Sequence, residues 1–247
     1  MLTEERRSLI IKIVGENKSA SVSELMELFD TSESTIRRDL TELDRKGALI
    51  KVFGGAVARE DNIMTLDASV NERADLNKES KTKIAVYAAS LIENDDIVYI
   101  DSGTTTALMV EHIVATNATF VTNSVLIARL LAAKNLNVLM PGGQLKTKTE
   151  ALIGPDTCEY LLKLYFTKCF VGANGISQKY GITTPDKQEA SVKEIAIMQS
   201  KNKFILADNS KFDKICAALF CDIKKATIIT DSSINNSYKS LSNIITV

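Results

Sequence analysis

The sequence predicts an α/β fold in two domains: a small helical domain at residues 1–57 and a larger domain with a mostly parallel sheet at residues 70–247. Three short amphipathic helical patterns and a Gly-Gly turn fill the first part, whereas short β-rich runs alternate with helical stretches in the second. The chain has 247 residues, 45% of them apolar, so each domain can bury a core. Residues 58–69 lack clear periodicity and are expected to form a linker.

Start signals and apolar stripes predict the first two helices of the small domain. Helix one is expected to begin with Thr3 as its N-cap, followed by two glutamates that are favourable near the positive end of the helix dipole. The run Ser21-Val22-Ser23-Glu24 fits a capping box that opens helix two. The side chains expected to be buried in these helices are Leu9, Ile10, Ile13, Val14, Leu25, Leu28 and Phe29.

The third helix of the small domain differs on its two sides. Apolar residues recur at Ile36, Leu40 and Leu43, while the other side carries short hydroxyl residues and adjacent arginines. A basic hairpin follows, in which two short strands flank Gly54-Gly55. Such a helix just before a basic hairpin is typical of a winged helix-turn-helix domain that binds DNA. The residues expected to contact DNA are Ser34, Thr35, Arg37, Arg38 and Lys51.

The alternative for this third helix is an ordinary surface helix whose arginines pair with acidic neighbours. Arg37 and Arg38 would then bind Asp39 or Glu42. Three short helices followed by a basic hairpin favour the DNA-binding interpretation. The formal net charge of −1 does not argue against it, because a DNA-binding module needs clustered charge rather than an overall excess.

The larger domain alternates predicted strands with predicted helices, which favours a parallel sheet covered on both faces. The predicted strands are 97–100, 119–122, 136–140, 168–172, 204–207, 227–230 and 243–247. One amphipathic helix is marked by Ile84, Tyr87, Ala88 and Leu91. The other predicted helices are 125–133, 154–164 and 186–200, the last with Pro185 in its first turn.

A hydroxyl-rich loop directly follows the strand at 97–100. A strand-to-helix turn with glycine exposes backbone N–H groups at a helix N-terminus, and such a place attracts an anion. The spacing fits neither a nucleotide P-loop nor a dinucleotide-binding motif, so we expect one small phosphate monoester. The alternative is that Thr104 merely caps a helix. The residues expected to bind the anion are Asp101, Ser102, Gly103, Thr104, Thr105 and Thr106.

Other polar turns follow the later predicted strands. Because the carboxyl ends of parallel strands lie at one edge of a sheet, we expect these turns to converge on a small-molecule pocket. Glu189 and Lys193 are spaced as i, i+4 partners and are expected to form a solvated surface pair, unless the fold brings them over the pocket. The further residues expected to bind the ligand are Thr122, Asn123, Gly142, Gly143, Asn174 and Lys211.

Several classes of site are not expected in this chain. Its four cysteines have no C-x-x-C spacing and there is a single histidine, so no metal site and no cofactor are predicted. The cysteines are expected to be reduced and buried. The N-terminus lacks the pattern of a signal peptide and no apolar run reaches the length of a membrane span, so we expect a cytoplasmic protein with no membrane partner.

These motifs together resemble those of the DeoR family of bacterial transcriptional regulators, over nearly the whole chain. The resemblance implies a repressor of a sugar-utilisation operon that a phosphorylated sugar releases from operator DNA. It also implies a homo-oligomer, dimer or tetramer, and a C-terminal domain similar to ribose-5-phosphate isomerase. The motifs that carry it are T-I-R-R-D-L at 35–40, Gly54-Gly55-Ala56, D-S-G-T-T-T at 101–106, T-N at 122–123, G-G at 142–143 and A-D-N-S-K-F at 207–212.

Within the family, the segments around Glu150, Thr183 and Glu189 look closest to fructose-operon repressors, which nominates fructose 1-phosphate as the effector. The isomerases that this domain resembles carry an acidic cluster where this chain has Gly172-Ala173-Asn174-Gly175. Without those carboxylates the general base of an isomerase is missing, so we expect a sensor and not an enzyme. Two alternatives remain: a sugar-phosphate isomerase or deaminase with an appended DNA-binding module, and an α/β domain that only oligomerises.

Overall fold

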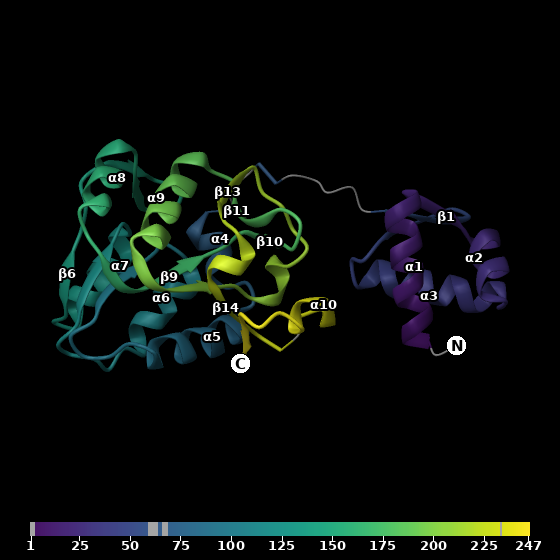
Figure 1. The fold of residues 1–247 in the computed structure, drawn as a ribbon, viewed down its shortest axis with the longest axis horizontal. Helices are drawn as coiled ribbons and strands as arrows, with labels where there is room; N and C mark the ends of the chain where they lie inside the picture. The colour runs from purple at the N-terminus through teal and green to yellow at the C-terminus, as the bar shows by residue number, and fades with distance from the viewer. Residues whose placement is uncertain (1–2, 59–63, 66–68, 233) are drawn as a thin grey trace. The chain divides into compact units, whose positions relative to one another are not determined.

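The computed structural model describes residues 3–58, 64–65, 69–232 and 234–247, and the chain divides into two compact units, residues 1–62 and 63–247 (Figure 1). Each unit has a hydrophobic core of its own. The division falls within the segment 58–69 that the sequence marks as a linker. Most of that segment lies outside the described residues, so the linker bounds stay a prediction.

Unit 1 contains the three predicted helices and the predicted hairpin. The hairpin strands β2 and β3 pair antiparallel, and a further strand, β1, pairs with β3 on its other side. The core comprises Ile10 and Val14 of the first helix together with the apolar stripe of the third. The elements are α1 Thr3–Asn17, β1 Ser19–Ser21, α2 Val22–Phe29, α3 Glu33–Arg45, β2 Ile50–Val52 and β3 Gly55–Val57.

The structure confirms the capping box of α2 and corrects the burial of two leucines. Ser21 Oγ accepts a hydrogen bond from the Glu24 N–H, and the Glu24 carboxylate accepts one from the Ser21 N–H. Leu9 and Leu28, however, are exposed, because α1 and α2 each bury only a narrow stripe against α3 and the small sheet. Thr3 is the first residue of α1 rather than its cap.

Unit 2 is built on a seven-stranded sheet in the order β15-β14-β12-β9-β4-β5-β6, and each neighbouring pair is parallel. All seven predicted strands are confirmed, three of them with identical bounds. The strands are β4 Ile97–Ile100, β5 Thr119–Thr122, β6 Asn137–Leu139, β9 Phe166–Gly172, β12 Ser200–Leu206, β14 Thr227–Thr230 and β15 Ile244–Thr246.

Helices cover both faces of this sheet, as the alternating pattern predicts (Figure 1). Successive residues of β4 face opposite layers: Val98 and Ile100 belong to the cluster with α5, α6 and α7, whereas Tyr99 belongs to the cluster with α8 and α9. The helices are α4 Val70–Ala74, α5 Lys78–Ser90, α6 Thr104–Glu111, α7 Val125–Ala133, α8 Pro155–Leu162, α9 Lys187–Met198 and α10 Asn236–Lys239. In the described part of the chain no helix is long and apolar enough to cross a membrane.

Three features of unit 2 depart from the sequence prediction. Asp186 caps α9 by accepting hydrogen bonds from the N–H groups of Gln188 and Glu189, so Pro185 precedes the helix instead of lying in its first turn. An antiparallel hairpin, β7 Gln144–Lys146 with β8 Ala151–Ile153, was not predicted. Neither was a second antiparallel sheet of β10 Gly175–Ser177, β11 Gly181–Thr184 and β13 Ala218–Cys221.

Candidate functional site

The exposed side of α3 carries the residues that the sequence predicts to contact DNA. Arg38 is exposed and has no hydrogen bond or ion pair within the described residues. Ser34 and Thr35 lie in the first turn, where both hydroxyls are within hydrogen-bond distance of Ser32 Oγ, at 3.1 and 2.9 Å. Arg37 binds Glu33 one turn earlier, with its Nη2 2.6 Å from the carboxylate. The pairings of the alternative interpretation, with Asp39 or Glu42, do not form.

A buried carboxylate fixes the position of α3 in unit 1. Asp39 is 2% exposed and accepts hydrogen bonds from Arg6 Nε at 2.7 Å and Arg7 Nε at 2.8 Å, both on α1. Because α1 thereby holds α3 through a charged pair as well as through apolar packing, the exposed face of α3 has a defined orientation. The sequence signal was an acidic residue inside the apolar stripe, between Ile36 and Leu40.

The hairpin of unit 1, the wing, is attached to α3 and to β1. Lys51 Nζ donates a hydrogen bond to Thr41 Oγ1 at 2.7 Å, which links the wing to the exposed side of α3. Gly54 has a φ of +83°, and its carbonyl accepts the Val22 N–H at 2.8 Å. A Cβ at Gly55 would lie 2.3 Å from the Ala20 carbonyl oxygen, so only glycine permits this approach of β3 to β1.

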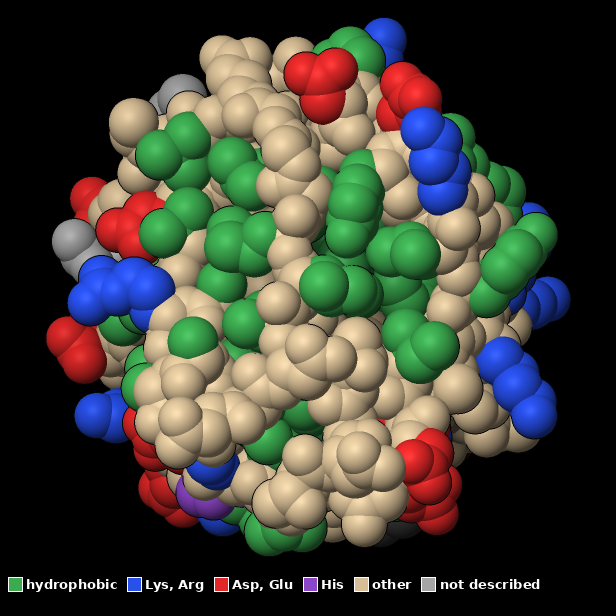
Figure 2. Space-filling model, turned by 90° about the vertical axis from the view of Figure 1, so that its left-hand side faces the viewer, with side chains coloured by type: hydrophobic (Ala, Val, Ile, Leu, Met, Phe, Trp, Pro, Cys, Tyr) green, Lys and Arg blue, Asp and Glu red, His purple; other side chains and the backbone are tan. Residues whose placement is uncertain are grey.

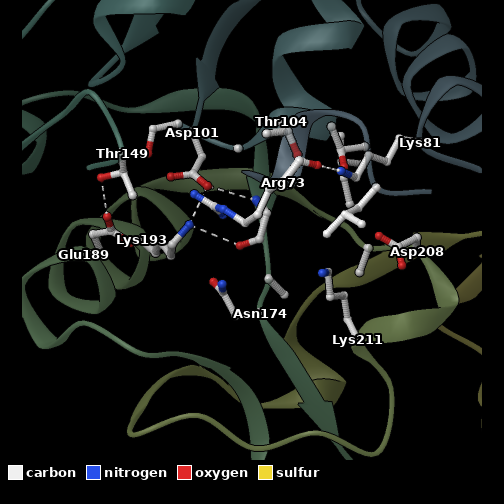
Figure 3. A pocket seen from close by; sticks show the side chains of 18 residues that line it. Arg73, Lys81, Asp101, Thr104, Thr149, Asn174, Glu189, Lys193, Asp208 and Lys211 are labelled. Carbon is white, nitrogen blue, oxygen red and sulfur yellow. Dashed lines mark hydrogen bonds and ion pairs between the residues drawn. The ribbon is translucent and has the colours of Figure 1, made fainter. Parts of the chain in front are cut away.

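Unit 2 has a pocket at the carboxyl edge of its sheet (Figure 3). Its lining includes the predicted residues Asp101, Ser102, Gly103, Thr104, Thr105, Asn174 and Lys211. It also includes Glu189 and Lys193, expected from the sequence to form a surface pair unless the fold brought them over the pocket, and four side chains that were not predicted ligands: Arg73, Lys81, Thr149 and Asp208. The loops after β4, β9 and β12 therefore meet at the carboxyl edge of the sheet, where ligands bind in open α/β folds.

The loop after β4 presents backbone donors to the pocket. Gly103 occupies the N-cap position of α6, so Thr104 is a helical residue and not the cap. The first backbone N–H groups of a helix lack intrahelical acceptors, which leaves those of Thr104 and Thr105 available. Thr106 is buried and does not line the pocket. Its hydroxyl accepts the Gly103 N–H at 2.9 Å and donates to the Asp101 carbonyl at 2.6 Å, which fixes the loop.

One end of the pocket holds two buried carboxylates, each with its own ammonium partner. Lys193 Nζ lies 2.5 Å from Asp101 Oδ2, and the same oxygen accepts the Gly172 N–H at 3.0 Å. Glu189 accepts hydrogen bonds from Thr149 Oγ1 at 2.7 Å and Lys146 Nζ at 3.0 Å. Glu189 and Lys193 are therefore both in the pocket lining and bind other residues, not each other.

The other end of the pocket gathers cationic side chains around Asp208 (Figure 3). Lys81 Nζ donates to the Arg73 carbonyl, and Asp208 Oδ1 accepts Asn77 Nδ2 at 2.9 Å. Burial lowers the pKa of the Lys81 ammonium, while the carboxylate of Asp208 opposes that shift. Burial also lowers the pKa of Lys211, and Asp208 again opposes the shift. A bound anion would relieve the cost of keeping these two ammonium groups charged.

Besides Thr106, four predicted ligand residues lie outside the pocket lining. Asn123 accepts a hydrogen bond from the Tyr99 hydroxyl at 2.9 Å and donates one to the Leu152 carbonyl of β8 at 3.0 Å. Its side-chain amide is therefore already bound to other parts of unit 2. The hydroxyl of Thr122 accepts the Ser124 N–H. The Gly142 carbonyl accepts Thr157 Oγ1, and a Cβ at Gly143 would lie 2.2 Å from that same Oγ1. The unpredicted hairpin β7–β8 is thus the reason that these turns do not reach the pocket.

Comparison with known proteins assigns both units. The family model of the DeoR-like helix-turn-helix domain matches residues 6–62, and that of the DeoR C terminal sensor domain matches residues 76–232. This chain belongs to the DeoR family. Its DeoR relatives include the HTH-type transcriptional regulator FruR of Bacillus subtilis, 41% identical over 231 residues, which are 93% of this chain and 91% of that protein.

A second DeoR-type relative is the lactose phosphotransferase system repressor of Streptococcus mutans, 32% identical over 247 residues, 98% of this chain and 97% of that protein. Among solved structures, ribose 5-phosphate isomerase A of Methanocaldococcus jannaschii covers 55% of each chain with a TM-score of 0.40 and 16% identity. The family membership makes this chain a transcriptional regulator with an N-terminal DNA-binding domain and a C-terminal sensor domain.

Proposed function

We propose that this DeoR-family chain is a cytoplasmic repressor of a sugar-utilisation operon and that a phosphorylated sugar in the unit 2 pocket releases it from operator DNA. The Streptococcus mutans relative, a repressor of a sugar phosphotransferase system, favours this class of operon. The observation that carries the proposal is the lining of the pocket, which combines the first backbone amides of α6 and several cationic side chains with paired carboxylates.

The cationic end suits one phosphate group. The amides of Thr104 and Thr105 begin α6 and add the positive end of its dipole, while Lys211 supplies charge. Within the described residues the buried hydroxyl of Thr105 and the ammonium of Lys211 have no hydrogen-bond partner. Both groups are therefore available to phosphate oxygens.

The carboxylate end suits sugar hydroxyls. Asp101 and Glu189 can accept hydrogen bonds from a polyol, and Asn174 can contribute its amide. Lys193 is bound to Asp101, and Lys146 binds both Asp186 and Glu189, so both lysines at this end already have carboxylate partners. The arrangement favours a monophosphate such as fructose 1-phosphate over fructose 1,6-bisphosphate, with tagatose 6-phosphate as a further candidate.

A thermal-shift panel tests the proposed ligand. Fructose 1-phosphate should raise the melting temperature of the chain, and free fructose should not, because the phosphate is the main anchor. Thr105→Val should abolish the shift with little change in the unliganded melting temperature, since valine has a similar shape and threonine has no described hydroxyl partner. Equal stabilisation by fructose and its phosphate would contradict the anion site. If no sugar phosphate in the panel raised the melting temperature, the result would favour the alternative in which the domain only oligomerises.

The segment between the units offers a route from ligand to DNA. Residue Arg73 of α4 lines the pocket, and Met64 pairs with the strand segment around Cys216, where its N–H binds the Ile215 carbonyl at 2.9 Å. We propose residues 57–75 as the coupling element. An effector that lowers operator affinity by one to two decades implies about 1.4–2.8 kcal/mol of coupling. Operator DNA must then weaken ligand binding by the same factor, which titrations with and without DNA measure.

We infer a sensor and not an enzyme. The pocket does contain carboxylates, contrary to the expectation drawn from residues 172–175, but they come from other elements. Asp101, Glu189 and Asp208 each accept hydrogen bonds from internal donors and are not poised as free general bases. A coupled isomerase assay tests this inference, since turnover above the uncatalysed rate would favour the enzyme alternative.

We also propose that the protein is a homo-oligomer. Figure 2 shows a face of unit 2 on which apolar side chains gather in the centre and charged ones at the rim. Figure 1 labels the edge strand β6 and helix α8 on this side, and these elements expose Leu139 and Leu162; Leu145 of β7 is exposed as well. Such a patch is typical of a protein interface. Light scattering on the full chain should give a dimer or tetramer, and Leu145→Asp should lower that mass.

A further inference from the structure

The tip of the wing presents a fully exposed aromatic side chain. Phe53 has 107% of the reference exposure. The partly exposed strand residues Ile50 and Val52 precede it, and the turn glycine Gly54 follows it. Soluble proteins rarely leave large apolar side chains grouped in water unless a partner covers them. Lys51 is the residue of this hairpin that the sequence predicts to contact DNA, and the aromatic tip is a separate feature beside it.

The ring is presented by a fixed backbone. The Gly54 carbonyl accepts the Val22 N–H at 2.8 Å, and β3 is paired on both sides, with β1 and with β2. The close approach of Gly55 to the Ala20 carbonyl leaves no room for this part of the hairpin to shift. A side chain on such a support loses little conformational freedom when it binds, which suits a contact residue.

One cation of the wing, Lys51, lies two residues from the tip and faces the exposed side of α3. Lys51 binds Thr41 Oγ1, and Thr41 lies one turn after Arg37 and Arg38 on the exposed side of the helix. The backbone N–H of Lys51 donates to Asp44 at 3.3 Å, so one carboxylate is also near the base of the wing. An apolar tip next to this basic surface matches a nucleic-acid partner better than an apolar protein surface, because the cations need phosphates.

We propose that Phe53 inserts into the minor groove of operator DNA when α3 occupies the adjacent major groove. Apolar wedges of this kind partly unstack a base step and bend the duplex. Pyrimidine–purine steps unstack most easily, so the wing would select a TA or CA step without reading a base edge. The inference rests on the proposed DNA-binding role of unit 1, and adds a second, shape-based source of specificity to it.

The test begins with the full chain and a pool of random DNA duplexes. Selection with the wild-type protein should enrich a TA or CA step beside the site read by α3, and selection with Phe53→Ala should lose that step alone. On the selected wild-type duplex, Phe53→Ala should bind about tenfold more weakly. Phe53→Leu should retain part of the affinity, because leucine is also an effective wedge.

The salt dependence separates this contact from a phosphate contact. An apolar wedge releases no counterions, so Phe53→Ala should leave the slope of log affinity against log salt unchanged, whereas Lys51→Ala should lower its magnitude by about one. The melting temperature of Phe53→Ala should equal that of the wild type, since the ring packs against nothing that is lost.

Each contrary outcome has a definite meaning. Wild-type affinity for Phe53→Ala, together with a clear loss for Arg38→Ala, would overturn the wedge and leave the proposed DNA-binding role intact. Wild-type affinity for both variants would contradict that role itself. If Phe53→Ala lowered the oligomeric mass in light scattering and left DNA binding unchanged, the ring would be a protein contact and the wedge would be wrong.

Discussion

An arginine on the exposed side of α3 stands in solvent, whereas a lysine and an aspartate of the unit 2 pocket form a buried ion pair. Arg38 has no partner among the residues that the structure describes, and Lys51 makes one bond to a threonine hydroxyl. Asp101 and Lys193, by contrast, are both buried and bind each other at 2.5 Å. DNA supplies its own dense negative charge, so free cations suffice there. The uncharged sugar part of the proposed ligand instead needs hydrogen-bond donors and acceptors that are already in place.

The largest effect should follow from breaking the buried pair in the pocket. Lys193→Met leaves the Asp101 carboxylate buried without its ammonium, and we expect unit 2 to lose about 3–5 kcal/mol of unfolding free energy. Urea denaturation measures the loss. The double variant Lys193→Met/Asp101→Asn should recover most of it. The matched control is Lys163→Met, which removes an exposed pair with Glu159 and should cost little. A single variant as stable as the control would contradict the importance of pairing.

The next largest effect concerns the unpaired arginine of α3. Arg38→Ala should weaken operator binding by about 1–3 kcal/mol and relax specificity at one base pair, with no loss of protein stability. Gel shifts over a salt series, beside a thermal melt, measure both quantities. The control is Arg45→Ala, because that guanidinium already binds Glu42 near the end of the helix. Equal losses from the two variants would mean that charge alone, and not the position on the helix, determines binding.

A pH series tests whether the ammonium group of Lys211 binds the ligand in the unit 2 pocket. Burial lowers the pKa of Lys211 in the free protein, and a bound phosphate would favour the ammonium and raise that pKa. Affinity for fructose 1-phosphate should therefore fall as the pH rises through the lowered pKa, starting below the ordinary lysine value of about 10.4. Calorimetry between neutral and alkaline pH measures it. Lys211→Arg should flatten the dependence, and an equally steep profile in that variant would place the titrating group elsewhere.

The smallest effect should come from the exposed ion pair between Arg37 and Glu33 on α3. Glu33→Gln would free Arg37, whose Nη2 lies 2.6 Å from that carboxylate, and would remove a negative charge close to the DNA. Exposed pairs of this spacing contribute about 0.3–0.5 kcal/mol, so operator affinity should rise by about twofold. Fluorescence anisotropy at low and high salt measures the gain, which should shrink with added salt. Weaker binding would show that Glu33 orients Arg37 productively.

The sequence predicted the strands and helices well because the apolar residues that mark them are also the residues buried in the folded domains. The apolar run at β4 lies inside the sheet, between β9 and β5, and its predicted bounds, 97–100, are those observed. Leu28 was misplaced because α2 packs through Leu25 on a single narrow stripe. Half of the pocket could not be predicted. Arg73 and Lys81 carry no motif and reach the ligand site only because α4 and α5 are folded against the sheet edge.

The burial of Asp39 between Arg6 and Arg7 has a consequence for how this regulator can diversify. Asp39 and the apolar stripe of α3 attach the helix to its domain from the inside, whereas Ser34, Arg37 and Arg38, which are predicted to contact DNA, are exposed. After gene duplication, one copy could therefore change the exposed residues of α3 and bind a new operator while the fold of unit 1 stays stable. The same separation would let an engineer transplant the outward set of another regulator onto this helix and keep its response to the original metabolite.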